Sequence, residues 1–181
     1  MKKITATLAA LTLLFFAQQS MAWSAQKLEE KSEKALAKLY ARNPQTAALG
    51  KKAAAVLVFP EIVRAGFIIG GQRGDGVLFL HGKVAGYYNT TSASYGLQAG
   101  IQRFGYALFF MNEESLKYFK KSDGFELGGA PSLVVLDMGI SGSLSTMTLQ
   151  KGIYALFFNQ QGLMAGLSLQ GTKITEYIPS K

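Results

Sequence analysis

The chain has no cysteine, one histidine and four prolines among its 181 residues, and only 17% of its residues are charged. Without cysteine it cannot form a disulfide, a thiolate zinc site, an iron–sulfur cluster or a thiol nucleophile. A single histidine, His81, is too few for the usual histidine-built metal sites and for most histidine acid–base schemes. These absences argue against most classes of enzyme. We therefore predict a non-enzymatic protein with no catalytic residue, no metal site and no cofactor.

The abundant residues are apolar or basic. Hydrophobic residues make up 49% of the chain, which is too many for a disordered protein, so a packed core is expected. The length suits a single globular unit. Lys and Arg number 19 and Asp and Glu 11, so the formal net charge is +8. A surplus of this kind favours an anionic partner.

The first 22 residues have the pattern of a secretory signal peptide. Lys2 and Lys3 precede an apolar run over residues 4–17, and small residues flank a cleavage position after Ala22. A spanning helix needs about 20 apolar residues, so this run is short for a retained anchor. We expect the mature chain to begin near Trp23 and to reach the periplasm. There nucleic acid is not an expected partner, which leaves anionic lipid, polysaccharide or an acidic protein.

Residues 23–52 form the expected N-terminal helical segment. Residues 23–42 lack glycine and proline and predict one helix, and Asn43-Pro44 predicts the start of a second, short helix. At 100° per residue the cations of the first helix fall on one stripe, beside three leucines, and Glu30 is placed to pair with Lys34. The stripe contains Lys27, Lys31, Lys34, Lys38 and Arg42, and the leucines are Leu28, Leu36 and Leu39. The leucines either pack on a sheet or insert into a membrane beside the lysines.

Residues 53–181 predict a β-rich unit. Short apolar runs separated by glycine and polar residues indicate strands over 53–59, 65–70, 77–80, 83–89, 95–102, 106–111, 132–136, 153–158, 163–169 and 173–177. Gly74-Asp75-Gly76 predicts a tight turn, and glycines inside strands indicate strong curvature. Asn112 and the charges after it predict one inserted helix over 113–122. The expected fold is α+β: N-terminal helices packed on a curved, mostly antiparallel sheet or half-closed barrel with one inserted helix.

Two pairs of adjacent phenylalanines need cover on both faces of the sheet. Neighbouring residues of a strand point to opposite faces, so Phe109-Phe110 and Phe157-Phe158 each place one ring on either side. The cover is either the helices and the far wall of the half-barrel, or an acyl chain in a cavity.

From residue 51 onward the chain resembles the SYLF lipid-binding domain family. The matching stretches are Lys52-Ala-Ala-Ala-Val-Leu-Val-Phe-Pro60, Arg64-Ala-Gly-Phe67, Gly70-Gly-Gln-Arg-Gly-Asp-Gly-Val77, Gly96-Leu-Gln-Ala-Gly100, Leu127-Gly128 and Gly162-Leu-Met-Ala-Gly-Leu-Ser-Leu-Gln-Gly171. The resemblance implies binding of phosphoinositide or other anionic lipid and, for some eukaryotic members, of actin. Actin is not an expected partner of an exported bacterial member, so the implied partner is an anionic phospholipid or membrane surface.

The leading hypothesis is a peripheral protein of the cell envelope that binds anionic lipid through basic residues. Its candidate lipid-binding residues are the five cations of the helix stripe and four near the first hairpins, Lys51, Lys52, Arg64 and Arg73. Two alternatives remain open. One is an integral outer-membrane β-barrel, and the other is a soluble carrier with an apolar lipid cavity.

Overall fold

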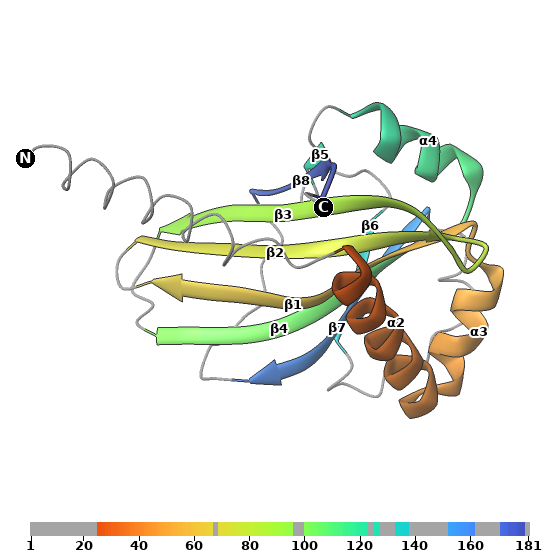
Figure 1. The fold of residues 1–181 in the computed structure, drawn as a ribbon, viewed down its shortest axis with the longest axis horizontal. Helices are drawn as coiled ribbons and strands as arrows, with labels where there is room; N and C mark the ends of the chain where they lie inside the picture. Colours follow the sequence, from red (N-terminus) through yellow and green to blue (C-terminus); the bar gives the residue numbers. More distant parts are fainter. Residues whose placement is uncertain are drawn as a thin grey trace, which may run out of the picture.

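A computed structural model describes residues 25–66, 69–95, 100–122, 125–126, 133–137, 152–161 and 171–179 (Figure 1). The signal peptide expected at 1–22, Trp23, the strand expected at 163–169 and most of the two Gly-Leu-x-x-Gly motifs lie outside these residues.

Three helices form where local signals predicted them. Helix α2 covers Ala25–Arg42 and helix α3 covers Pro44–Lys52. Between them Asn43 caps α3, because its Oδ1 accepts hydrogen bonds from the backbone N–H of Gln45 at 2.9 Å and Thr46 at 3.3 Å. Helix α4 covers Glu113–Lys121 and is capped in the same way by Asn112. The two N-terminal helices and the inserted helix are confirmed.

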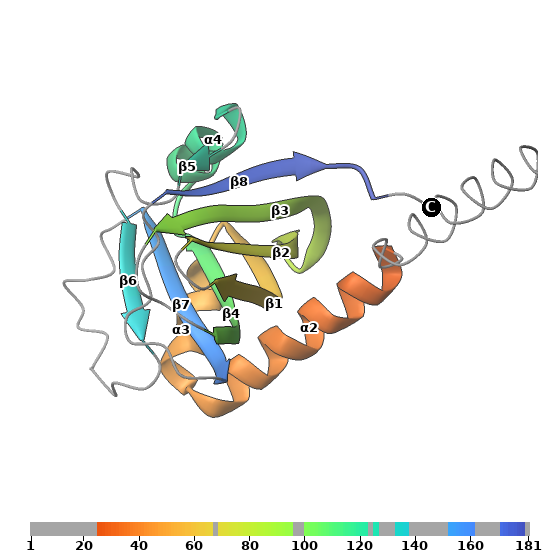
Figure 2. The same cartoon turned by 90° about the vertical axis from the view of Figure 1, so that its left-hand side faces the viewer.

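The described strands form one sheet in the order β5-β8-β3-β2-β1-β4-β7-β6. All neighbouring pairs are antiparallel except β6 and β7. Seen along the strands, the sheet curls into a half-barrel with α2 and α3 on its outer side (Figure 2). The predicted α+β fold is therefore confirmed. The strands are β1 Ala55–Gly66, β2 Ile69–Leu80, β3 Lys83–Tyr95, β4 Gly100–Phe110, β5 Phe125–Glu126, β6 Leu133–Asp137, β7 Ile153–Gln161 and β8 Thr172–Tyr177.

The tight turn expected at Gly74-Asp75-Gly76 is wrong, because these residues lie inside β2. Opposite them, β1 continues through Pro60 with a shift of register between residues 58 and 61. A Cβ on Gly76 would lie 2.6 Å from the carbonyl oxygen of Val58, so glycine is needed for the close approach of the two strands. The true turn follows at His81 and Gly82, which both have positive φ angles, of 49° and 77°.

The sheet separates two cores. The inner core fills the half-barrel with aromatic rings such as Phe59, Tyr106 and Phe157, and α4 covers it with Leu116 and Phe119. Contacts between these rings, such as those of Tyr106 with Phe59 and Phe157, favour cover by side chains over cover by an acyl chain.

The outer core lies between the sheet and helices α2 and α3. In both phenylalanine pairs one ring belongs to each core: Phe109 and Phe158 face outward, and Phe110 and Phe157 face inward. Cover by helices and by the far wall, the first of the two interpretations, is therefore confirmed. The α2 leucines also belong to this core, so they pack on the sheet.

Candidate functional site

The buried side of α2 determines where its charges lie. Leu28, Ser32 and Leu39 are buried against the sheet and fall within about 40° of one another at 100° per residue. The basic stripe is centred about 100° to one side of them, and the carboxylates of Glu29 and Glu33 lie toward the other side. The helix therefore presents its cations along one flank and its acids along the opposite flank.

Some cations of the stripe have acidic neighbours. Lys34 pairs with Glu30, as expected, and this contact lowers the pKa of Glu30 through its hydrogen bond and then through charge attraction. Lys31 lies 3.7 Å from Glu61 on β1. Within the described ranges no ion pair involves Lys38 or Arg42, and both side chains are exposed.

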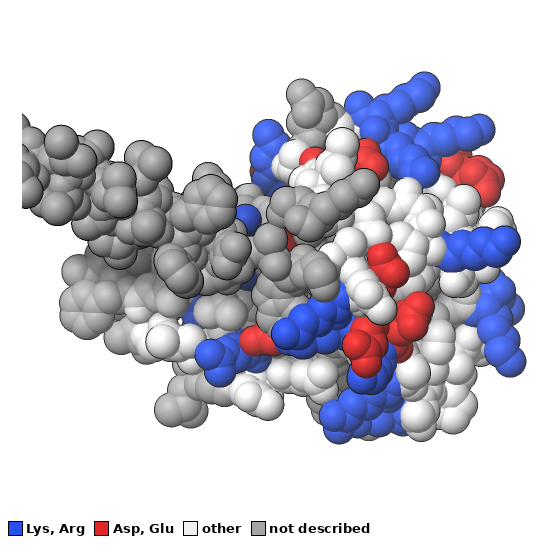
Figure 3. Space-filling view, viewed as in Figure 1, with Lys and Arg blue, Asp and Glu red and all other residues white. Residues whose placement is uncertain are grey.

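Glu29, on the acidic flank, links the helix to the sheet. The hydroxyl of Tyr87 on β3 donates a hydrogen bond to the Glu29 carboxylate, and that bond is the first cause of the raised pKa of Tyr87, followed by burial. On the protein surface, carboxylates and cations are seen side by side over α2 (Figure 3).

A second group of cations lies on the outer face of the sheet, in one row across the strands. Val63 of β1 is the register partner of both Arg73 and Arg103, and Thr91 of β3 is the partner of both Arg73 and Lys173. These three cations are exposed, and Val63 among them is 40% exposed. We call Arg73, Arg103 and Lys173 the sheet row.

Glu61 joins the sheet row to the helix stripe. Its carboxylate lies 3.7 Å from the Lys31 ammonium and 3.7 Å from Nε of Arg103. The stripe and the sheet row therefore form one surface, which we call the basic face. Ile101, in the neighbouring row of β4, adds an apolar side chain that is 67% exposed.

Arg64 does not belong to this surface, so its prediction as an exposed basic residue is wrong. It is 7% exposed, and its side chain lies on the inner face of β1. The reason is strand alternation after the bulge at residue 60: Val63 points outward and the next residue therefore points inward.

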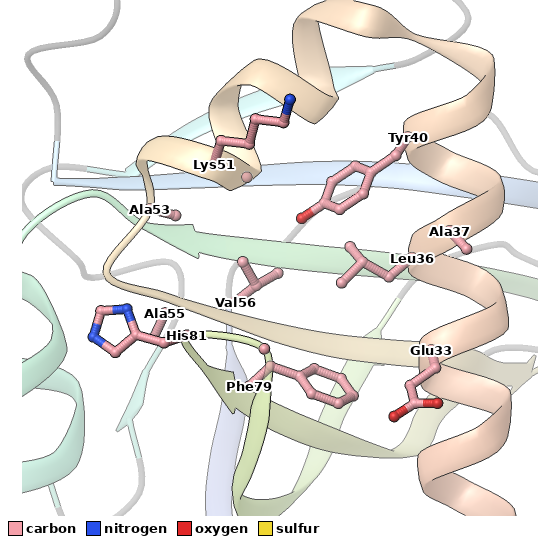
Figure 4. Close-up of a pocket in the computed structure, with 12 residues that line it drawn as sticks. Glu33, Leu36, Ala37, Tyr40, Lys51, Ala53, Ala55, Val56, Phe79 and His81 are labelled. Carbon is pink, nitrogen blue, oxygen red and sulfur yellow. The ribbon is translucent and has the colours of Figure 1, made fainter.

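Lys51 and Lys52 are exposed at the end of α3, but they lie apart from the basic stripe. Lys51 borders a pocket between α2, α3 and the sheet, on the side of α2 that carries Glu33 (Figure 4). The pocket has a volume of about 430 Å³ and an apolar floor. It is lined by Glu33, Leu36, Ala37, Tyr40, Gly50, Lys51, Ala53, Ala55, Val56, Phe79, His81 and Gly82.

Two groups of basic residues were not predicted from the sequence. Arg103 and Lys173 join the basic face only through cross-strand register, for which no local pattern exists. On α4, Lys117, Lys120 and Lys121 form a further exposed basic group. In the sequence, these lysines are explained by the favourable interaction of cations with the C-terminal end of a helix. Their close spacing was the signal that could have identified them as a basic surface group.

Two further findings bear on chemistry. In the described part of the chain, no three His, Cys, Asp or Glu side chains gather in a way that could hold a metal ion. No helix among the same residues is both long enough and apolar enough to cross a membrane.

Comparison with known proteins identifies relatives. Residues 91–178 match the family Ysc84, described as "Las17-binding protein actin regulator". "Protein YSC84" of Saccharomyces cerevisiae is 27% identical over 133 residues, which are 69% of this chain and 28% of that protein. "LAS seventeen-binding protein 3" of S. cerevisiae strain YJM789 is 28% identical over 133 residues, covering 69% of this chain and 29% of the relative. The chain thus spans less than a third of either relative. The motifs in the sequence and these matches agree in indicating similarity to the SYLF (Ysc84) family.

Proposed function

We propose that this protein is a non-enzymatic, peripheral lipid-binding protein that docks its basic face on an anionic membrane surface. One observation carries the proposal: the helix stripe and the sheet row meet at Glu61, and the exposed side chains of Val63 and Ile101 lie in and next to the sheet row. The resemblance to the SYLF family supports a lipid-related role without naming the lipid.

The charges of the basic face are numerous enough to hold the protein at a membrane reversibly. A basic residue near an anionic leaflet contributes about 1 kcal/mol at physiological salt. Four such residues therefore supply up to about 4 kcal/mol, or nearly a thousandfold in affinity. The attraction decays within a Debye length of about 8 Å, so only cations that face the bilayer together contribute.

Exposed apolar side chains on the same face make a second favourable contribution to the free energy of membrane binding. Val63 lies between Arg73 and Arg103, and Ile101 lies in the adjoining row. Side chains of this kind enter the headgroup region when a cationic surface docks. The helix leucines do not take part, because Leu28 and Leu39 are buried.

Vesicle co-sedimentation with three variants of equal charge change tests the proposal. One reverses Lys27 and Lys38 in the stripe, one reverses Arg73 and Lys173 in the sheet row, and the matched control reverses Lys120 and Lys121 on α4, all to Glu. With phosphatidylglycerol or cardiolipin vesicles at low salt, we expect the first two to lose at least tenfold in affinity. The α4 variant should retain most of its binding.

Three other outcomes of the vesicle experiment would count against binding through a defined basic face. Equal losses in all three variants would indicate attraction by net charge without a defined face. A wild-type protein that fails to co-sediment with these vesicles at low salt contradicts the proposal outright. Binding that survives 1 M salt would also contradict it, because the Debye length is then about 3 Å.

The carrier alternative keeps one candidate location. The pocket beside Lys51 has an apolar floor of Leu36, Val56 and Phe79 and charged residues at its rim (Figure 4). Native mass spectrometry of purified protein would detect an acyl ligand there. The integral-membrane alternative is weakened because α2 and α3 cover much of the outer sheet face.

Location and partners follow from the same proposal. We propose export to the periplasm on the basis of Lys2, Lys3 and the apolar run after them. The family description names Las17 and actin, yet a periplasmic protein would meet neither. We therefore expect no co-sedimentation with actin filaments under conditions in which anionic vesicles bind.

A further inference from the structure

A row of polar side chains crosses the inner face of the half-barrel at one end. Arg64 of β1 is the register partner of Gln72 on β2 and of Gln102 on β4, and all three are buried. Ser92 of β3 is the partner of both Gln72 and Thr172 on β8, which extends the row. Figure 2 looks along the strands from the end of the sheet at which β1 stops, two residues beyond Arg64.

This row contains polar atoms without partners. Arg64 Nη1 and Gln102 Oε1 are buried, and neither makes a hydrogen bond with any described residue. Arg64 is 7% exposed and Gln102 is 2% exposed. No carboxylate of the described residues forms an ion pair with Arg64. A buried guanidinium is normally paired with an anion, because burial without a counter-charge is strongly unfavourable.

Arg64 has hydrogen-bonding neighbours on both sides. Gln72 Nε2 donates a hydrogen bond to Thr172 Oγ1 at 3.4 Å, a long contact that holds the amide within the row. The Gln102 amide can turn either its oxygen or its NH₂ group toward a ligand. A guanidinium flanked by two amides on neighbouring strands offers donors from several directions, which suits a phosphate group.

We infer that Arg64, Gln72 and Gln102 form an internal binding site for a phosphate group at the end of the half-barrel. The bound group is either free phosphate or the headgroup of a lipid that reaches this end of the sheet. The site lies on the opposite face of the sheet from the basic face, so either proposal can fail without the other.

Thermal unfolding in phosphate tests this site. Phosphate should raise the Tm of the wild-type protein by about 5–10 °C at 100 times its Kd, compared with chloride at equal ionic strength. Arg64→Met should abolish this rise and should itself raise the Tm in chloride, because it removes an unpaired buried charge. Lys120→Gln, a change of equal charge at an exposed residue of α4, should leave the phosphate response intact.

A second measurement applies if Arg64→Met does not fold. In a ¹⁵N spectrum of the wild-type protein, the Nε–Hε signal of Arg64 should shift in a saturable way with phosphate, and the signal of Arg103 should not. Arg64→Lys, which keeps the charge but loses the planar fork, should weaken phosphate binding at least tenfold.

The source of the phosphate is decided by two ligands, inorganic phosphate and a short-chain phosphatidylglycerol below its micelle concentration. A stronger response to the lipid assigns the site to a headgroup, and an equal or weaker one assigns it to free phosphate. Absence of any Arg64-dependent response to both ligands would overturn the proposal. So would a lower Tm of Arg64→Met in chloride together with no phosphate effect on the wild type, since Arg64 would then be purely structural.

Discussion

The central strands differ between their two ends. In the packed half, residues 55–59 of β1 and 106–110 of β4 are all buried, with apolar cover on both faces. In the polar half, residues 61–66 and 100–104 alternate between exposed outer positions and inner positions that include Arg64 and Gln102. The bulge near Pro60 marks the boundary between them.

The difference assigns different tasks to the two halves. The packed half has helices on one side and aromatic rings on the other, so it supplies most of the hydrophobic free energy. The polar half is only partly covered and holds the sheet row and the internal site at Arg64, both of which are proposed to bind anions. Changes in the packed half should therefore affect stability, and changes in the polar half should affect binding.

The largest expected effect is on the free energy of unfolding. It is tested by truncating one side chain of β4 in each half. Phe110 is fully buried in the inner core, with its ring centroid 4.9 Å from that of Phe119. Phe110→Ala should lower the free energy of unfolding by about 3–5 kcal/mol. Ile101→Ala, in the polar half, should change it by less than about 0.5 kcal/mol. Urea denaturation measures both, and similar losses would remove the distinction between the halves.

Two glycines of β2 give a second, smaller contrast. A Cβ on Gly76 would meet the carbonyl oxygen of Val58 at 2.6 Å, whereas the nearest atom to a Cβ on Gly71 is 3.6 Å away. Gly76→Ala must shift the backbone and should cost about 1–3 kcal/mol. Gly71→Ala should remain within about 0.5 kcal/mol of the wild type. Equal tolerance of both substitutions would show that β1 and β2 do not approach each other closely at the bulge.

Tyrosine ionisation should make the fold sensitive to alkali. Burial, followed by the charge and hydrogen bond of Glu176, raises the pKa of Tyr88 to about 12, and burial raises that of Tyr106 further. An unfolded tyrosine ionises near pH 10. Because the pKa is higher in the folded state, the stabilisation that neutral Tyr88 and Tyr106 contribute is complete below pH 10. It is lost as the pH rises toward 12.

Urea midpoints measured at pH 9, 10 and 11 check this dependence. We expect a falling midpoint across the series and a shallower fall in Tyr88→Phe, which removes the ionising group and keeps the ring. Tyr118→Phe on α4 is the control, because its side chain is exposed. If the urea midpoint of Tyr88→Phe fell with pH as steeply as that of the wild type, Tyr88 would not be the group responsible.

The sequence predicted those parts of the fold that depend on neighbouring residues. Asn43-Pro44 and Asn112 begin helices because a cap and the first helical turn lie within four residues of each other. The phenylalanine pairs indicated a sheet covered on both faces, because alternation along a strand is also local. The helix stripe followed from the 3.6-residue period in the same way.

The errors arose where distant segments meet. Gly74 and Gly76 resemble a turn, but here glycine serves a close approach to β1, which depends on a bulge in another strand. Arg64 was expected among the basic residues near the first hairpins, between two strands, but β1 continues through this region and the alternation after the bulge turns Arg64 inward. Arg103 could not be joined to Lys31, since the shared contact with Glu61 depends on how α2 packs against β1 and β4.

The smallest expected effect on stability comes from Glu61, at the boundary between the halves. Its contacts with Lys31 and Arg103 are both 3.7 Å long and partly exposed, so each contributes less than about 1 kcal/mol and is screened by salt. Glu61→Gln should therefore lower the free energy of unfolding by less than about 1 kcal/mol in low salt and by nearly nothing in 1 M salt.

The same substitution should strengthen membrane binding although it lowers stability. Removing the carboxylate adds one positive charge to the centre of the basic face, which is worth about 1 kcal/mol, or roughly fivefold in affinity for anionic vesicles. Glu114→Gln, an equal charge change at an exposed residue of α4, should leave vesicle binding nearly unchanged. A Glu61→Gln protein that is slightly less stable yet binds more tightly would place the membrane contact at the junction of stripe and sheet row. Weaker binding would mean that the Glu61 contacts hold the two groups in a geometry that binding requires.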